Sequence, residues 1–208
     1  MLACKNISFS FGTKRIFENL NLAIDEGQIA AVIGQNGSGK TTILKILMGA
    51  IVSKEGALFL DNQKISNKIS QKASYRQLLG ILFQHESLDR RLSVRENLLY
   101  AGMLYGIDAA DLKNSIDQAL KRADLIAHKD TPVKKLSGGM ARRIEIYRAF
   151  MHKPKLLLLD EPTSGLDPES IKFFFDFLKK YVYLNKAAAI FSTNRPEEIE
   201  NSDLRVEL

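Results

Sequence analysis

The sequence predicts a protein of the α/β class, with a mixed or parallel sheet, an antiparallel β part and an inserted α-helical part. Two short apolar runs, residues 28–33 and 156–159, have the nearly continuous hydrophobic character of strands buried in a parallel sheet. Strand signals disappear over residues 85–137, where helical patterns replace them. With 208 residues, of which 45% are hydrophobic, the chain is long enough for a single domain with one hydrophobic core.

The N-terminal part is predicted to combine strands of both directions. Strand composition is found in residues 2–11, 20–24 and 28–33. Asp61 and Asn62 stand between the apolar residues 57–60 and Ile65, and both residue types tolerate the left-handed backbone of a tight turn. We therefore expect an antiparallel hairpin at this point.

The helical part is predicted from a capping sequence and from helical spacing. Ser93 and Glu96 form the Ser-x-x-Glu pattern that begins many helices. A second helix is expected over residues 108–121, where apolar side chains recur at Leu112, Ile116, Ala119 and Leu120. The predicted division of residues 1–208 is a core formed by residues 1–84 and 138–208 and a helical subdomain formed by residues 85–137.

Strand character returns after the helical part. Residues 156–159 and 187–191 are apolar runs, and a helix is expected between them over residues 169–183. A strand, a helix and a second strand in this order predict parallel neighbours joined by a right-handed crossover. The aromatic residues of this helix have the spacing of a helix that covers a sheet, so we expect them to pack against it.

A glycine-rich loop follows the apolar run 28–33. Gly34 and Gly39 are separated by four residues and are followed by Lys40 and Thr41, which is the pattern of a phosphate-binding loop. The glycines let backbone N–H groups face a phosphate, and the helix that begins here adds a partial positive charge. We expect Lys40 to reach the β- and γ-phosphates of ATP and the Thr41 hydroxyl to coordinate Mg²⁺. The other residues expected to bind the nucleotide in this loop are Gln35, Asn36, Gly37, Ser38 and Thr42.

Two carboxylates stand at the end of the apolar run 156–159. Asp160 is expected at the carboxyl edge of the sheet, where open α/β sheets bind ligands, and on the metal side of the site. Glu161 is suited to orient or deprotonate the water that attacks the γ-phosphate. The loop and the two acids together resemble the core of RecA-like P-loop NTPases, which implies hydrolysis of a nucleoside triphosphate with Mg²⁺.

A second anion site is predicted at the Leu-Ser-Gly-Gly sequence of residues 136–139. Ser137 offers a hydroxyl, and Gly138 and Gly139 offer backbone donors at the start of a helix. This sequence resembles the signature of ATP-binding-cassette (ABC) ATPases, and the order of the motifs resembles that family over nearly the whole chain. The resemblance implies that these residues cover the γ-phosphate bound to a second nucleotide-binding subunit, in a head-to-tail homodimer or heterodimer.

Further residues take their expected roles from the same resemblance. Gln84 resembles the glutamine that senses Mg²⁺ and the attacking water, and Phe11 matches the aromatic position that stacks on adenine. Asp167 would meet the partner subunit. Met140 replaces a more usual glutamine, and Leu-Ser-Gly-Gly-Met-x-Arg-Arg resembles the branch that exports drugs, polysaccharides and lipid-linked sugars.

Asn194 departs from the family pattern, because it follows Ser-Thr where the resemblance predicts a histidine that contacts the γ-phosphate. An asparagine amide can still donate a hydrogen bond, but it cannot become a cation or relay a proton. We therefore expect slowed hydrolysis with ATP binding largely retained.

The partners and location are also predicted. The apolar runs are too short to span a bilayer, and the N-terminus lacks a secretory signal. The resemblance implies an ABC transporter ATP-binding subunit, with export favoured, held at the cytoplasmic face of the membrane by a polytopic permease subunit. No nucleic acid partner is expected. The alternatives are a soluble ABC-type ATPase and a regulator that binds ATP but hydrolyses it weakly.

Overall fold

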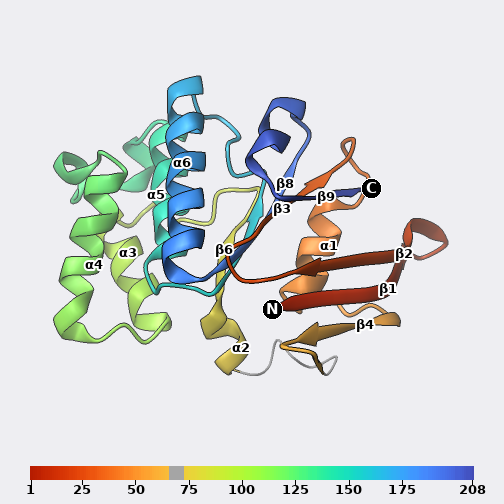
Figure 1. Cartoon of the computed structure of the whole chain (residues 1–208). Coiled ribbons are helices and arrows are strands. Elements are labelled where there is room, and N and C mark those ends of the chain that lie inside the picture. The colour runs from red at the N-terminus through yellow and green to blue at the C-terminus, as the bar shows by residue number, and fades with distance from the viewer. Residues whose placement is uncertain (66–72) are drawn as a thin grey trace.

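The computed structural model describes residues 1–65 and 73–208. These residues form two β-sheets and the helices around them (Figure 1). In the described residues the first sheet is antiparallel with strand order β2-β1-β4-β5, and the second is parallel with order β6-β7-β8-β3-β9. The first comprises Leu2–Phe11 (β1), Lys14–Ile24 (β2), Glu55–Leu60 (β4) and Gln63–Lys64 (β5). The second comprises Ile29–Ile33 (β3), Leu79–Leu82 (β6), Leu156–Asp160 (β7), Ala188–Thr193 (β8) and Leu204–Glu207 (β9). The predicted α/β class, with its parallel and antiparallel parts, is confirmed.

The predicted hairpin joins β4 to β5. Asp61 and Asn62 have φ angles of 50° and 62°, so both central residues of the turn adopt the left-handed conformation. Two such residues in succession are typical of a type I′ turn, whose twist matches that of paired strands. The local sequence therefore determines this hairpin without help from the rest of the fold.

The central strand β7 is buried on both faces. Leu156 and Leu158 pack in a cluster with helix α1 (Lys40–Leu47) and the antiparallel sheet. Leu157 and Leu159 point to the opposite face, into a cluster with helices α5 (Gly138–Phe150) and α6 (Pro168–Asn185). Because side chains alternate along a strand, a continuous apolar run is required here rather than an alternating one.

Helices α3 (Val94–Leu104) and α4 (Ala109–Arg122) form the helical part seen at one end of the molecule (Figure 1). The predicted capping box is present, since the Ser93 side chain accepts from the Glu96 N–H and the Glu96 carboxylate accepts from the Ser93 N–H. A third apolar cluster joins these helices to α5, which therefore contacts both the sheet and the helical part. Within residues 73–208, short 3-10 helices span Ile126–His128, Val133–Lys135 and Pro196–Asn201.

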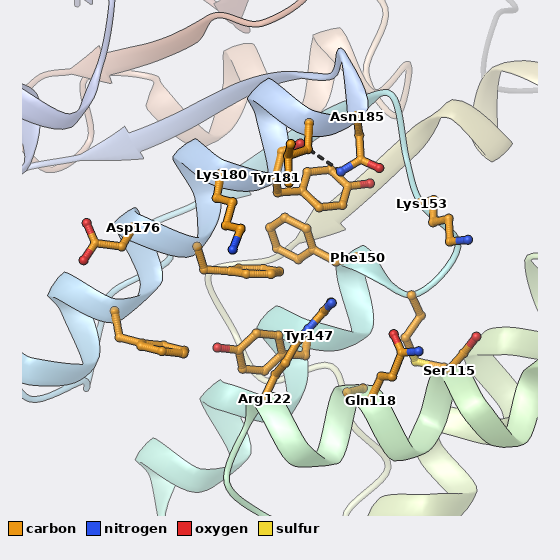
Figure 2. A pocket seen from close by; sticks show the side chains of 15 residues that line it. Ser115, Gln118, Arg122, Tyr147, Phe150, Lys153, Asp176, Lys180, Tyr181 and Asn185 are labelled. Atoms are coloured by element: carbon orange, nitrogen blue, oxygen red, sulfur yellow. Dashed lines mark hydrogen bonds between the residues drawn. The ribbon is translucent and has the colours of Figure 1, made fainter.

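The buried aromatic side chains of α6 divide between two neighbours, whereas Phe173, which was also expected to pack, is 56% exposed. Phe174 and Phe175 are buried in the cluster under the sheet, as predicted. Phe177 instead packs edge-on against Tyr147 and Phe150 of α5. Figure 2 shows Tyr147, Phe150 and Tyr181 on the floor of a pocket of about 460 Å³ between α4, α5 and α6. The aromatic stripe thus fills the junction between the sheet layer and the helical part.

Three elements differ from the sequence-based expectation. Strand β2 begins at Lys14 rather than near residue 20. Its first half has two exposed polar pairs, Lys14–Arg15 and Glu18–Asn19, on either side of Ile16 and Phe17, so the alternation typical of a strand is absent there. Helix α2 (Ala73–Leu78) and the edge strand β9 were not predicted, since both are too short to carry a clear periodicity. Across residues 1–65 and 73–208, no helix has both the length and the apolar character needed to cross a membrane.

Candidate nucleotide site

The phosphate loop connects the end of β3 to the start of α1. Gly37 and Gly39 have φ angles of 82° and 113°, a backbone conformation that residues with a Cβ rarely adopt. A Cβ at Gly39 would also lie 2.5 Å from the Ile16 side chain of β2. Helix α1 then begins at Lys40, and Gly39 gives its N-terminus no side-chain cap. The orphan N–H groups of this helix end suit an anion.

Lys40 is folded back over this loop. Its ammonium donates hydrogen bonds to the carbonyls of Gly34 at 2.8 Å and Gln35 at 3.0 Å, and the side chain is buried. Within the described part of the chain, the Ser38 hydroxyl is buried without a hydrogen-bond partner. A buried cation and an unpaired hydroxyl on one loop fit the phosphate oxygens of a nucleotide, which accept from both.

Asp160 connects three elements at the carboxyl edge of the parallel sheet. Its carboxylate accepts from the Thr41 hydroxyl of α1 at 2.7 Å and from the Ser192 hydroxyl of β8 at 2.6 Å. Hydroxyl and carboxylate oxygens are hard ligands that suit Mg²⁺, which usually takes one or two protein oxygens together with phosphates. In the described residues there is no group of three or more His, Cys, Asp or Glu side chains placed to hold a metal. The donor set therefore fits a Mg²⁺ ion that a nucleotide brings with it.

Glu161 leaves the sheet in an unusual backbone conformation. Its φ angle is 44°, a region that costs non-glycine residues about 1–3 kcal/mol. The conformation is held by the Glu161 N–H, which donates to the Ser192 hydroxyl at 3.0 Å. Ser192 thus fixes both acids through one hydroxyl. Ser192 was not predicted as a site residue, and its place at the end of an apolar run, two residues before Asn194, is the signal that could have found it.

Lys40, Thr41 and Glu161 line one open cleft of about 600 Å³, and Asp160, which is not in its lining, contacts it through the hydrogen bond with Thr41. Its lining comprises Phe11, Lys14, Ile16, Asn36, Gly37, Gly39, Lys40, Thr41, Thr42, Gln84, Glu161 and Asn194. Phe11 is part of this lining and has 55% of its surface exposed. Its ring packs edge-on against Phe9, with the two ring centroids 5.0 Å apart. An exposed ring at the edge of a phosphate cleft is available for stacking on a base. Lys14 and Ile16 were not predicted, because nothing in their local sequence marks them.

Asn194 reaches the phosphate loop directly, where its side-chain amide donates a hydrogen bond to Asn36 at 3.2 Å. The preceding Thr193 hydroxyl donates to the buried Glu198 carboxylate, which also accepts from Thr163 in the loop after Glu161. Glu198 therefore connects the loop after β7 to the end of β8. It was also missed, because a lone glutamate in a short 3-10 helix carries no sequence signal.

The Leu-Ser-Gly-Gly residues lie outside this cleft. Ser137 caps helix α5, where its hydroxyl accepts from the Met140 N–H at 3.2 Å. Ser137 and Gly138 are exposed, and Gly139 follows them in the first turn. None of the three lines the cleft that contains Lys40 and Thr41. The chain thus has a phosphate cleft and, apart from it, a free helix N-terminus with exposed donors.

A phosphate loop before α1, an Asp–Thr pair beneath it and a carboxylate after β7 define a P-loop nucleoside triphosphatase. More narrowly, the chain belongs to the ABC transporter family, whose profile matches residues 17–164.

Two relatives illustrate the range of the family. The Nod factor export ATP-binding protein I of Cupriavidus metallidurans is 34% identical over 200 residues, covering 96% of this chain and 65% of the relative. The Fe(3+) ions import ATP-binding protein FbpC of Escherichia coli strain K12 is 35% identical over 163 residues, covering 78% of this chain and 46% of the relative. This chain therefore spans less than two thirds of the length of these relatives.

The fold is similar to that of a solved cassette in a dimer. The ATP-binding cassette MJ0796, in a post-hydrolysis state bound to ADP and Pi, superposes with a TM-score of 0.88 at 26% sequence identity. The match covers 100% of this chain and 94% of that chain.

Proposed function

We propose that this chain is the ATP-binding and ATP-hydrolysing subunit of an ABC transporter. ATP closes a dimer of nucleotide-binding subunits, and hydrolysis reopens it, which drives a separate membrane-spanning permease subunit. In this role the chain is peripheral at the cytoplasmic face of the membrane. We further propose that residues 1–84 and 138–208 act as the ATP-binding core and residues 85–137 as the helical subdomain.

The separation of two anion sites in one chain carries the proposal. The cleft around Lys40 offers a cation, a helix N-terminus and acids, but it receives nothing from Ser137 or Gly138. The exposed N-terminus of α5 has backbone donors that do not line this cleft. A head-to-tail pair of subunits would bring each α5 onto the nucleotide of the other subunit and so complete both sites.

The roles within the cleft follow from the positions of its groups. Lys40 holds the β- and γ-phosphates, while Thr41 and Asp160 hold Mg²⁺ together with Gln84. When bound, Mg²⁺ neutralises charge that develops on the phosphate oxygens. Glu161 orients the attacking water and accepts its proton, and Asn194 donates its amide to the γ-phosphate. Phe11 stacks on adenine. Positioning and charge stabilisation account for most of the catalysis.

Exposed apolar side chains on α3 suit contact with a membrane subunit. Tyr100, Met103 and Leu104 are 54%, 61% and 88% exposed. They lie in the second half of α3, the helix whose Val94 and Leu98 pack in the cluster shared with α4 and α5. A separate concave surface includes Gln84, His85 and Ser87 in its lining. A permease seated here would sense the position of Gln84. Export is favoured because the match to the export relative spans 96% of this chain, against 78% for the import relative.

A Glu161→Gln variant tests the proposal. The amide keeps the shape of the side chain but cannot accept a proton, so ATP should remain bound and a dimer should accumulate. Sedimentation velocity with ATP and Mg²⁺ should show this dimer, whereas the wild type and Glu26→Gln, a change on an exposed turn, should remain largely monomeric. If the Glu161→Gln variant stays monomeric in saturating ATP, the proposed ATP-dependent dimerisation is wrong.

Asn194 favours a second candidate function, a regulator that binds ATP but hydrolyses it weakly. An amide cannot carry the proton or the positive charge of a histidine. A soluble ABC-type ATPase without a permease is the third reading. ATPase rates measured with and without a co-purified membrane subunit separate them: stimulation by that subunit supports the transporter, a rapid rate without it supports the soluble ATPase, and a negligible rate in both supports the regulator.

A further inference from the structure

Arg142 occupies the second turn of α5 and is buried, with 6% of its surface exposed. Its guanidinium donates hydrogen bonds to four backbone carbonyls in the loops that follow β6 and β7. These carbonyls belong to Phe83 at 2.7 Å, Asp160 at 3.0 Å, Glu161 at 2.8 Å and Pro162 at 3.2 Å. Arg142 therefore contacts the residue before Gln84 and also the backbone of Glu161.

The fork of the guanidinium is fully used. Its fifth N–H donates to the Glu145 carboxylate at 3.1 Å, so all five donors have a partner. A planar group with five fixed donor directions holds its acceptors in one relative arrangement, which a flexible ammonium cannot do. The ends of β6 and β7 are thus fixed to α5, and through it to each other.

Glu145 extends the connection along the loop after Gln84. Its other oxygen accepts from the N–H and hydroxyl of Ser87. Arg148, one turn further along α5, donates to the Ser87 carbonyl at 3.2 Å. Burial lowers the pKa of Arg142, and the nearby Glu145 carboxylate opposes this effect. The segment that contains Gln84 is therefore attached to α5 at both ends, at Phe83 and at Ser87.

Helix α5 begins at Ser137, so its N-terminus is the site offered to the partner subunit under the proposed function. Arg142 lies only five residues further along the same rigid helix. We propose that Arg142 is a positioning residue that links this helix to Gln84 and Glu161. A shift of α5 when its N-terminus engages the partner's nucleotide then moves both residues of the chain's own cleft together. This inference rests on the proposed function.

The test compares Arg142→Gln, Arg142→Lys and Arg143→Gln. Arg143 is the adjacent residue on α5 and makes no side-chain hydrogen bond or ion pair with the described residues, so it is the matched control. Both Arg142 variants should lower kcat for ATP hydrolysis by about 10- to 100-fold, because a small misplacement of a catalytic group has effects of this size. The dissociation constant of a fluorescent ATP analogue should change by less than about threefold. Arg143→Gln should keep wild-type kcat.

Arg142→Lys separates positioning from folding. Lysine keeps the positive charge beside Glu145 but has no planar fork, so the variant should retain the thermal unfolding midpoint more closely than Arg142→Gln while kcat stays low. Full kcat in Arg142→Lys would overturn the inference. A loss of nucleotide binding equal to the loss of kcat would also overturn it, because the residue would then act on the fold of the cleft as a whole.

A double variant, Arg142→Gln with Glu161→Gln, distinguishes this inference from the proposed function. The double variant should still form the ATP-dependent dimer, since Arg142 acts on the hydrolytic residues and not on the phosphate loop. Dimerisation of Glu161→Gln but not of the double variant overturns the positioning role alone. Failure of Glu161→Gln itself to dimerise contradicts the proposed function.

Discussion

The Asn194 side chain donates a hydrogen bond to the Asn36 side chain, and this contact at 3.2 Å joins the segment after β8 to the phosphate loop. Both residues line the cleft that contains Lys40 and Glu161. The amide is neutral, so it can hold an oxygen by a hydrogen bond but cannot add positive charge. The contact places Asn194, which stands where the resemblance predicts a histidine, directly on the phosphate loop.

Replacing Asn194 with histidine should raise kcat for ATP hydrolysis. An imidazole can donate to the γ-phosphate and can also become a cation, which stabilises the charge of the transition state. We expect a gain of about tenfold or more, the lower range for a well-placed acid–base group. Steady-state phosphate release measures it. Asn194→Ala, which removes the amide, is the control, and no gain in the histidine variant would count against a limiting role for Asn194.

The hydroxyl of Thr41 should determine the Mg²⁺ requirement. Thr41→Ala removes the oxygen that donates to Asp160 at 2.7 Å and that is suited to coordinate the ion. The Mg²⁺ concentration for half-maximal ATPase activity should rise by about tenfold or more, as is common when a metal site loses an oriented partner. Thr41→Ser keeps the hydroxyl and should stay near wild type. Removing Mg²⁺ with EDTA should abolish turnover in all three proteins; equal Mg²⁺ curves for the alanine and serine variants would contradict this role.

The capping box of α3 should contribute to stability. Ser93→Ala removes the side-chain acceptor for the Glu96 N–H, so the free energy of unfolding should fall by about 1 kcal/mol. Urea unfolding followed by circular dichroism measures the change. Ser115→Ala, within α4, is the control and should change stability by less than about 0.5 kcal/mol. Equal effects of the two substitutions would show that the cap is not the cause.

His152 should make the stability depend on pH. Its Nε2 lies 2.9 Å from the Leu79 carbonyl, its ring stacks on Tyr105, and burial lowers its pKa from the ordinary value of 6.5. A lowered pKa in the folded state means that the unfolded state binds the proton first as pH falls. The contribution of neutral His152 to the free energy of unfolding is therefore complete above pH 6.5. It is lost as pH falls from there towards the pKa of His152 in the folded state.

The measurement is the urea midpoint at about pH 7.5 and about pH 5.5. His152→Gln should lose less stability between these values than the wild type, because glutamine does not titrate. His128→Gln changes an exposed histidine and should keep the wild-type pH dependence. If His152→Gln and the wild type lose stability equally, another group is responsible.

The local sequence was sufficient to predict those elements that are stabilised by interactions within a few residues. The hairpin at Asp61 and Asn62 and the helix start at Ser93 follow from backbone preference and from a cap that spans three residues. The phosphate loop is local as well, because its glycines and the following helix create the anion site within nine residues. The polar start of β2 could not be predicted, because its partner strand and not its composition makes it a strand.

The sequence by itself determined the class of protein and the residue types of the site, since Lys40, Thr41, Asp160 and Glu161 are recognisable by motif. Only the tertiary structure decided how these groups are held. Ser192 and Glu198 contact the site across the sheet, and Arg142 contacts it from a helix more than fifty residues from Gln84 in the chain. Such contacts depend on packing between distant segments. The local sequence predicts that a buried polar side chain needs a hydrogen-bond partner, but it does not predict which carbonyl that partner is.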